Sequence, residues 1–218
     1  MNIKSAIFDM DGTLVDSLFI WEVLWSSFGE RFLKDGSFAP SAEDDKRVRT
    51  LTLKDAMSLI HENYNLGESG EELLSLANEI MLDFYANRAE LKEGVLEFLE
   101  HLHRNGTKMC IASATAPELL SVAMDNLGLH KYFPVIFSCG AIGKGKDHPD
   151  VFLQAAEYLG ADIGETWVFE DSLVAIETAV NAGFKTVGIY DRFNFGQDRI
   201  KQLANEYIAD GETLLKLI

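Results

Sequence analysis

The sequence has few cysteines, few basic residues and no long apolar run. Only two cysteines occur among 218 residues, Cys110 and Cys139, and they suit neither a disulfide framework nor a zinc site. We therefore expect a reducing, cytoplasmic setting. Lysine and arginine total 19 against 35 acidic residues, a net charge of −16. This balance argues against nucleic acid or an anionic membrane as partner, because both bind basic surfaces. No apolar run reaches 18 residues, so we expect neither a membrane span nor a signal peptide.

Short, continuous apolar runs separated by helical patterns predict an α/β fold. The runs lie at residues 6–8, 108–112, 135–137, 167–169 and 186–190. Their lack of alternation is typical of parallel strands that are covered on both faces. Between them, apolar residues recur at helical spacing, and glycines follow where helices should end. From about residue 94 onward, this alternation predicts a βαβ series.

The stretch from about residue 17 to 88 shows helical spacing without a strand-like run. We therefore predict that residues 1–14 and 90–218 form the α/β core, and that residues 15–89 form an inserted helical unit. The polar segment Lys34–Lys46 is predicted to be a loop that joins two helices of this unit. The two linkers of the insert, near Leu14–Ser17 and Arg88–Glu93, should make a hinge.

Polar residues that can carry chemistry follow the predicted strand ends or lie in a glycine-rich stretch. They are Asp9, Asp11, Ser113, Lys146, Glu170 and Asp171. The ends of parallel strands meet at one edge of a sheet, where open α/β folds place their sites. Carboxylates gathered there repel one another and need a cation, and hard oxygen ligands suit Mg²⁺. Thr115 and Glu118 predict a capping box beside Ser113, and a helix N-terminus with a hydroxyl binds anions. The whole set predicts phosphoryl transfer.

Four ordered motifs make the chain similar to the haloacid dehalogenase superfamily, in its β-phosphoglucomutase-like and phosphoglycolate-phosphatase-like branch. Residues 9–17 match the pattern DxDGTLxDS, and residues 111–113 match the small-residue strand end with a serine. Residues 146–152 correspond to K-P-x-P-D-x-F, and residues 170–172 to EDS, followed by Ala-Gly at 182–183. The resemblance implies a Rossmann-like, three-layer α/β core with a parallel sheet and an inserted all-helical cap domain.

The resemblance also implies a role for each matching residue. Asp9 would be the nucleophile that becomes an aspartyl phosphate, and Asp11 would act as general acid and then as general base. Mg²⁺ would be held by Asp9, by the backbone carbonyl of Asp11 and by Asp171, with Glu170 beside it through water. The phosphoryl group would be bound by Gly12, Thr13, Ser113, Ala114 and Lys146, of which Ser113 and Lys146 count as catalytic.

The sequence departs from the family pattern at three places, one of which is Val174, where the branch often has glycine. Asp147 replaces the proline after the lysine, and Lys144 is a second lysine nearby, although the spacing to Pro149 favours Lys146. The segment Arg49–Asp55 lacks the glycine and arginine expected in a mutase substrate loop. This difference favours a phosphatase over a mutase.

The resemblance thus implies a Mg²⁺-dependent phosphatase that hydrolyses a small phosphorylated metabolite, a sugar or polyol phosphate, through an aspartyl phosphate. A β-phosphoglucomutase-like sugar phosphate mutase is the first alternative, since it would share every core residue. A catalytically idle binding protein is the second alternative, although it would have no chemical need to keep together Asp9, Asp11, Lys146 and Asp171. We expect the small metabolite as the partner, and a monomer or weak dimer.

Overall fold

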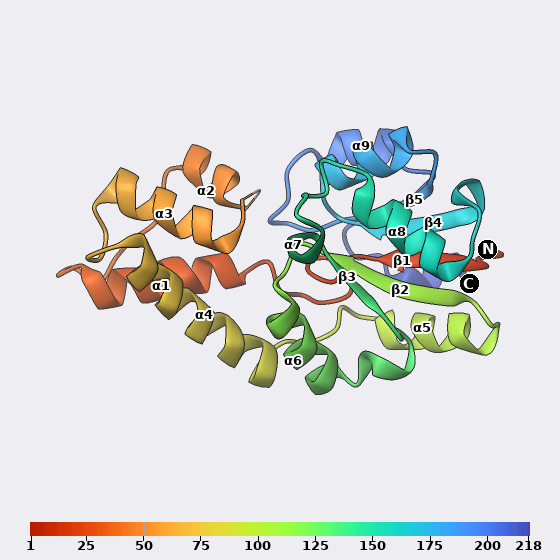
Figure 1. Cartoon of the computed structure of the whole chain (residues 1–218), viewed down its shortest axis with the longest axis horizontal. Helices are drawn as coiled ribbons and strands as arrows, with labels where there is room; N and C mark the ends of the chain where they lie inside the picture. The colour runs from red at the N-terminus through yellow and green to blue at the C-terminus, as the bar shows by residue number, and fades with distance from the viewer. Residues whose placement is uncertain (50) are drawn as a thin grey trace. The chain divides into compact units, whose positions relative to one another are not determined.

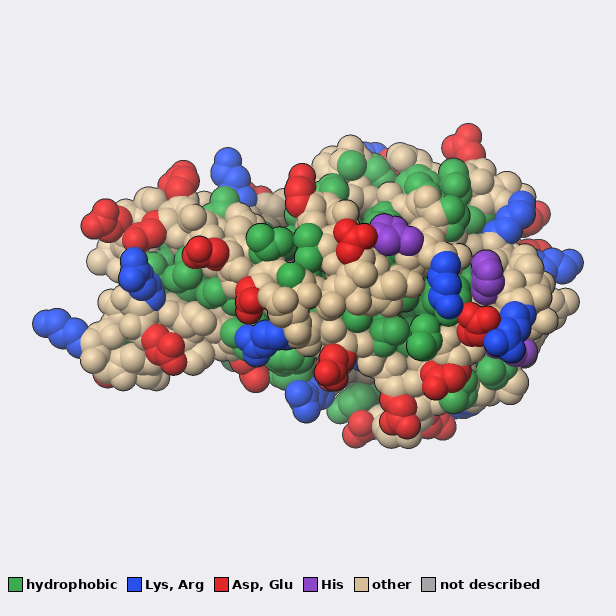
Figure 2. All heavy atoms as spheres, turned by 90° about the horizontal axis from the view of Figure 1, so that it is seen from below, with side chains coloured by type: hydrophobic (Ala, Val, Ile, Leu, Met, Phe, Trp, Pro, Cys, Tyr) green, Lys and Arg blue, Asp and Glu red, His purple; other side chains and the backbone are tan. Residues whose placement is uncertain are grey.

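The computed structural model describes residues 1–49 and 51–218, which divide into two compact units. The first unit comprises Met1–Leu18 and Ala89–Ile218, and the second comprises Phe19–Arg88. Within the described residues, no helix is long and apolar enough to cross a membrane. On the face drawn in Figure 2, basic side chains stand among acidic ones rather than gathering into one patch.

A six-stranded parallel sheet forms the centre of the first unit (Figure 1). Its strands are β1 (Ser5–Phe8), β2 (Lys108–Ser113), β3 (Ile136–Ser138), β4 (Thr166–Glu170), β5 (Lys185–Ile189) and β6 (Glu206–Ile208). Their order is β3-β2-β1-β4-β5-β6, and every neighbouring pair is parallel. The predicted α/β fold with a parallel sheet is confirmed. Strand β6 was not predicted, because its sequence Glu-Tyr-Ile is not a continuous apolar run.

Helices cover both faces of this sheet and make the three layers visible in Figure 1. Helices α5 (Val95–Arg104) and α6 (Pro117–Leu127) lie on one side, and α8 (Asp150–Leu159) and α9 (Leu173–Asn181) lie on the other. Two shorter helices, α7 (Cys139–Ile142) and α10 (Gln197–Leu203), complete the unit.

Successive strand residues face opposite layers, which explains why the strands read as continuous apolar runs. Ile7 of β1 belongs to one buried cluster with residues of α8 and α9. Its neighbour Phe8 instead stacks on Phe169 of β4, with ring centroids 4.3 Å apart, and meets Phe98 of α5 edge-on. Both faces of the sheet are therefore dry, and polar residues are confined to its ends.

The second unit is all-helical, as predicted. It contains α1 (Ile20–Phe32), α2 (Ala42–Val48), α3 (Leu53–Tyr64) and α4 (Gly70–Asn87), and α4 packs against both α1 and α3. The prediction of a loop over Lys34–Lys46 was wrong in its second half, because α2 begins at Ala42. The Ser41 hydroxyl caps this helix by accepting a hydrogen bond from the Asp44 N–H at 3.1 Å. Helix α2 has little apolar periodicity, and its cap was the remaining signal. Thr50, in the segment Arg49–Asp55, lies outside the described residues.

The two linkers of the insert are hydrogen-bonded to each other. Val15 and Leu91 form an antiparallel bridge. The Asp16 N–H donates to the Glu90 carbonyl at 3.0 Å, and the Lys92 N–H donates to the Leu14 carbonyl at 2.9 Å. The linkers thus lie side by side and extend the ordered part of the first unit beyond β1. The function of the second unit as a cap remains a prediction.

Candidate active site

The chain turns sharply just after β1 and leaves Asp9 at the end of that strand. The N–H of Asp9 still donates to the Phe169 carbonyl of β4 at 3.0 Å. Beyond it, the N–H groups of Leu14 and Val15 both donate to the Met10 carbonyl at 2.9 Å. Gly12, within this turn, has φ +76°, and a Cβ atom there would lie 2.1 Å from Asp171 Oδ2. Glycine is thus required for both the backbone conformation and the close approach of Asp171.

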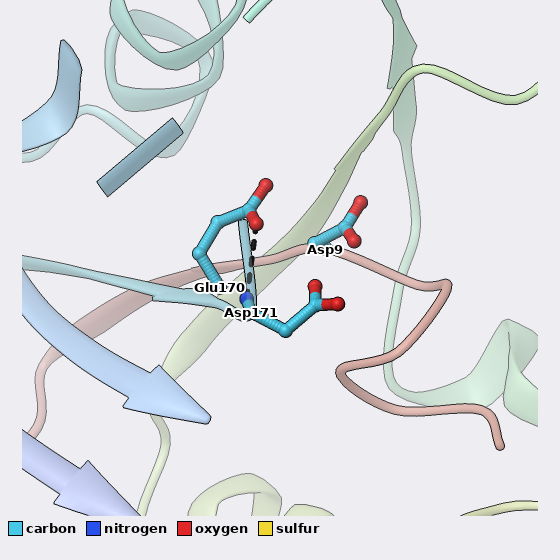
Figure 3. A group of neighbouring side chains, drawn as sticks. All are labelled: Asp9, Glu170 and Asp171. Atoms are coloured by element: carbon cyan, nitrogen blue, oxygen red, sulfur yellow. Dashed lines mark hydrogen bonds between the residues drawn. The ribbon is translucent and has the colours of Figure 1, made fainter. Parts of the chain in front are cut away.

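Three buried carboxylates gather at the ends of the adjacent strands β1 and β4. Asp9, Glu170 and Asp171 each offer an oxygen, and these atoms lie within 4.8 Å of one another. Figure 3 shows the carboxylates of Asp9 and Asp171 directed into the same space, whereas that of Glu170 bends back. Glu170 Oε2 accepts hydrogen bonds from the N–H groups of Asp171 and Ser172, each at 3.0 Å. Glu170 is therefore fixed against the start of α9.

Lys146 is the lysine that reaches these carboxylates. Its Nζ donates to Asp9 Oδ1 at 2.5 Å and also to Glu170 Oε1, and its side chain is only 11% exposed. The second lysine of the glycine-rich stretch, Lys144, pairs instead with the partly exposed Asp150 at 2.7 Å. The replacement of proline by Asp147 therefore does not keep Lys146 from the site.

Burial and mutual repulsion set the electrostatics of the cluster. Burial raises the pKa of Asp9 to about 8, against the opposing effect of Lys146 and with a further rise from Glu170. Burial likewise raises the pKa of Asp171 well above its usual range, and Glu170 and Asp9 add to the rise. For Lys146, burial alone would lower the pKa, but the two neighbouring carboxylates hold it above its usual value. The cluster thus has more acidic groups than Lys146 can neutralise.

A divalent cation suits this set of donors. Carboxylate oxygens are hard ligands, and a bound cation would relieve the repulsion that raises the two aspartate pKa values. Asp9 and Asp171 point into the common space (Figure 3), while both oxygens of Glu170 are engaged by Lys146 and by backbone N–H groups. The geometry therefore fits Asp9 and Asp171 as ligands, with Glu170 orienting Lys146.

Asp11 lies in the turn after Asp9, and two hydroxyls hold its carboxylate. The Ser17 Oγ donates to Asp11 Oδ1 at 2.6 Å, and the Thr115 Oγ1 donates to Asp11 Oδ2 at 2.7 Å. Ser113 ends β2 as a buried residue, and its Oγ accepts the Thr115 N–H at 3.1 Å. Its neighbour Ala114 is exposed.

The predicted capping box of Thr115 and Glu118 was wrong. Helix α6 begins at Pro117, and its N-cap is Ala116, which makes no side-chain cap bond. Thr115 lies one residue too early, so its hydroxyl is free to reach back across the strand ends to Asp11. Thr115 is thus a site residue that the sequence analysis interpreted as structural.

Two side chains hold the carboxylate of Asp171. The Thr13 Oγ1 donates to Asp171 Oδ1 at 3.0 Å. The amide of Asn194 donates to Asp171 Oδ2 and, at 3.2 Å, to the Asp171 backbone carbonyl. Asn194 follows β5 and was missed, since it belongs to no recognised motif. Its place shortly after a predicted strand is the same signal that identified the other site residues.

Comparisons with known proteins place the chain in a family. Residues 6–189 match the model of the haloacid dehalogenase-like hydrolase family. The chain is 25% identical to a phosphorylated carbohydrates phosphatase of Thermotoga maritima, over 97% of this chain and 96% of that one. It is 30% identical to the putative phosphatase YhcW of Bacillus subtilis, over 85% and 82%. The crystal structure of a putative β-phosphoglucomutase from Thermotoga maritima superposes with a TM-score of 0.80 at 24% identity, covering 99% and 98%.

Proposed function

The chain belongs to the haloacid dehalogenase-like hydrolase family, and we propose that it is a metal-dependent phosphatase of a small phosphorylated metabolite, a sugar or polyol phosphate. As a member with named phosphatase relatives, it is a phosphoric monoester hydrolase. Mg²⁺ is the proposed metal, because a small oxygen-lined site with few carboxylates suits it.

One observation carries this proposal. Asp9 is a buried carboxylate that contacts a buried lysine on one side and faces a second buried aspartate, Asp171, on the other. Such an arrangement orients Asp9 and surrounds it with groups that bind or balance a phosphoryl group. A purely structural ion pair would not need Asp171 in the same space, since the added repulsion opposes folding.

In the proposed mechanism, Asp9 is the nucleophile and Asp11 is the general acid and base. An oxygen of Asp9 attacks phosphorus, the ester P–O bond breaks, and Asp11 gives its proton to the leaving alkoxide. Asp11 then takes a proton from a water molecule, whose oxygen attacks the aspartyl phosphate and releases inorganic phosphate and free Asp9. Ser17 and Thr115 hold the Asp11 carboxylate in one orientation during both proton transfers.

The remaining site residues bind charge. Lys146 favours the ionised form of Asp9 and offers its ammonium to a phosphoryl oxygen, while Ser113 and the backbone at the exposed Ala114 offer hydrogen-bonding groups. Gly12 and Thr13 shape the turn around the same space. A bound Mg²⁺, held by Asp9, the Asp11 carbonyl and Asp171, would neutralise charge on the transferred group.

Two further observations bear on the substrate class and on the reaction outcome. The relative from Thermotoga maritima that is named for phosphorylated carbohydrates supports a sugar or polyol phosphate. In the segment Arg49–Asp55, Arg49 is paired with Asp45 of the same unit at 3.0 Å and lies over the ring of Trp21. Arg49 is therefore engaged within its own unit, and the preference for a phosphatase rests on the mismatch between the segment Arg49–Asp55 and a mutase substrate loop. The two free, buried cysteines agree with a reducing, cytoplasmic setting.

The proposal is tested by screening phosphorylated metabolites for phosphate release, with Mg²⁺ and with a chelator. The wild type should release phosphate from at least one sugar or polyol phosphate with Mg²⁺ alone, and Asp9→Asn should not. Asp16→Asn is a matched control, because Asp16 is an exposed acid of the same motif and should be dispensable. Full activity in excess chelator would refute the metal requirement.

A second assay separates the phosphatase from the mutase. The conversion of β-glucose 1-phosphate is followed by NMR with and without the corresponding bisphosphate. A phosphatase should release free phosphate and need no bisphosphate. Rapid formation of glucose 6-phosphate with little free phosphate would make the enzyme a mutase.

A further inference from the structure

We propose that Asn194 is a positioning residue that fixes the carboxylate of Asp171 for divalent-cation binding. This inference rests on the metal requirement of the proposed function. Asn194 lies between β5 and α10, outside every motif that the sequence presented. Its side chain contacts Asp171 rather than the reacting groups, so it would act through that residue.

The contacts of Asp171 leave its carboxylate little freedom to rotate. Thr13 donates to one oxygen at 3.0 Å, and the Asn194 Nδ2 donates to the other. The same Nδ2 also donates to the Asp171 backbone carbonyl at 3.2 Å, so Asn194 bridges the side chain and backbone of one residue. Each carboxylate oxygen keeps a further lone pair for a cation.

The residue type is required by these contacts. Both partners of Asn194 are acceptors, so the side chain must present two N–H donors, which an amide does and a carboxylate cannot. Asn194 therefore helps to hold the Asp171 carboxylate in one orientation.

A partly buried ion pair holds the turn that carries Asn194. Lys92 Nζ lies 2.9 Å from Asp191 Oδ2 and donates to the Tyr190 carbonyl at 3.2 Å. The other oxygen of Asp191 accepts the Phe193 N–H at 2.9 Å, and its backbone carbonyl accepts the Asn194 N–H at 3.1 Å. Asn194 is thus presented from an ordered turn, as a positioning role demands.

The test compares Asn194→Ala with Gln197→Ala. Gln197 is the matched control, because its side-chain amide supports the same turn by donating to the Asp191 carbonyl at 3.1 Å, without a hydrogen bond to the acidic cluster. Isothermal titration calorimetry with MgCl₂ and no substrate measures the dissociation constant of each protein. Mutation of a residue that hydrogen-bonds to a metal ligand typically lowers metal affinity by about 10- to 100-fold. Asn194→Ala should therefore weaken Mg²⁺ binding by at least about tenfold.

Further measurements distinguish a role of Asn194 in positioning Asp171 from a role in folding. Asn194→Leu, which keeps the bulk but has no donor, should weaken Mg²⁺ binding to a similar extent. The melting temperatures of both Asn194 variants in chelator should stay close to that of the wild type. Gln197→Ala should bind Mg²⁺ as the wild type does.

The outcomes distinguish this inference from the proposed function. Unchanged Mg²⁺ affinity in Asn194→Ala, or equal weakening in Gln197→Ala, would overturn the positioning role and leave the phosphatase proposal intact. Weakened binding in the Asn194 variants of a protein that hydrolyses no phosphomonoester would support the positioning role and refute the phosphatase. If the wild type binds no Mg²⁺, the inference is overturned.

Discussion

Replacing Gly12 by alanine should disable the site by pushing Asp171 out of place. An alanine at φ +76° costs about 1–2 kcal/mol in backbone strain alone. Its Cβ would also lie 2.1 Å from Asp171 Oδ2, whereas ordinary contacts begin at 3.4 Å, so the two groups must separate by about 1.3 Å. Asp171 cannot yield without losing its bonds to Thr13 and Asn194. Because a misplacement of about 1 Å can cost about 100-fold in rate, we expect a loss of that order.

Gly211→Ala is the control that distinguishes the effect of backbone strain from the effect of the clash with Asp171. Gly211 has the same φ of +76°, but a Cβ there would meet no atom within 4 Å. For a chain of this size, about 1–2 kcal/mol corresponds to a melting temperature lower by about 2–8 °C, with activity unchanged. Phosphate release from the best substrate of the screen and differential scanning fluorimetry measure the two effects. Activity of Gly12→Ala within a few-fold of the wild type would refute the reasoning.

Three further predictions concern the site carboxylates. Asp9→Asn removes the attacking oxygen, so phosphate release should vanish while the circular dichroism spectrum stays that of the wild type, and genuine residual turnover would contradict the mechanism. Thr115→Val removes one of the two hydroxyls that orient the Asp11 side chain, so kcat should fall by about tenfold, and an unchanged kcat would show that Thr115 is structural. Burial raises the pKa of Asp9 from 3.8 to about 8, so the metal-free folded chain binds more protons than the unfolded chain in this window. Its melting temperature in chelator should therefore fall as the pH rises from about 4 to 8, more steeply than that of Asp9→Asn, and parallel curves would argue against the raised pKa.

Most of the core could be predicted from the sequence, because its strands and helices have recognisable patterns of apolar residues over short stretches. Strands covered on both faces must be continuously apolar, and residues such as Ile7 and Phe8 show this without any knowledge of their partners. Elements with less pattern were missed. Strand β6 begins with the charged Glu206 and has no continuous apolar run, and α2 is a polar helix recognisable chiefly by its Ser41 cap.

Some residues of the candidate site could likewise be predicted from local patterns, and others could not. Asp9, Lys146, Glu170 and Asp171 stand directly beyond strand ends or in a distinctive stretch, and the structure brings them together. Thr115 was missed because it was interpreted as a helix cap, and Asn194 because it belongs to no recognised motif. Their partners, Asp11 and Asp171, lie 104 and 23 residues away. A hydroxyl before a proline favours a helix cap when only neighbours are considered, and nothing local reveals an acceptor across the sheet edge.

The same burial that makes the cluster costly to fold also suits it to chemistry. Away from water, Asp9 and Asp171 resist ionisation, and Lys146 offsets only part of that cost. A cation and a phosphoryl group bring opposite charges into this space, so each is favoured by the other and by the residues around it. Donors such as Thr13 and Asn194 then matter because they hold the Asp171 carboxylate in one orientation before either arrives. The site is therefore best understood as a partly neutralised acidic centre, completed by the metal and substrate that it is proposed to bind.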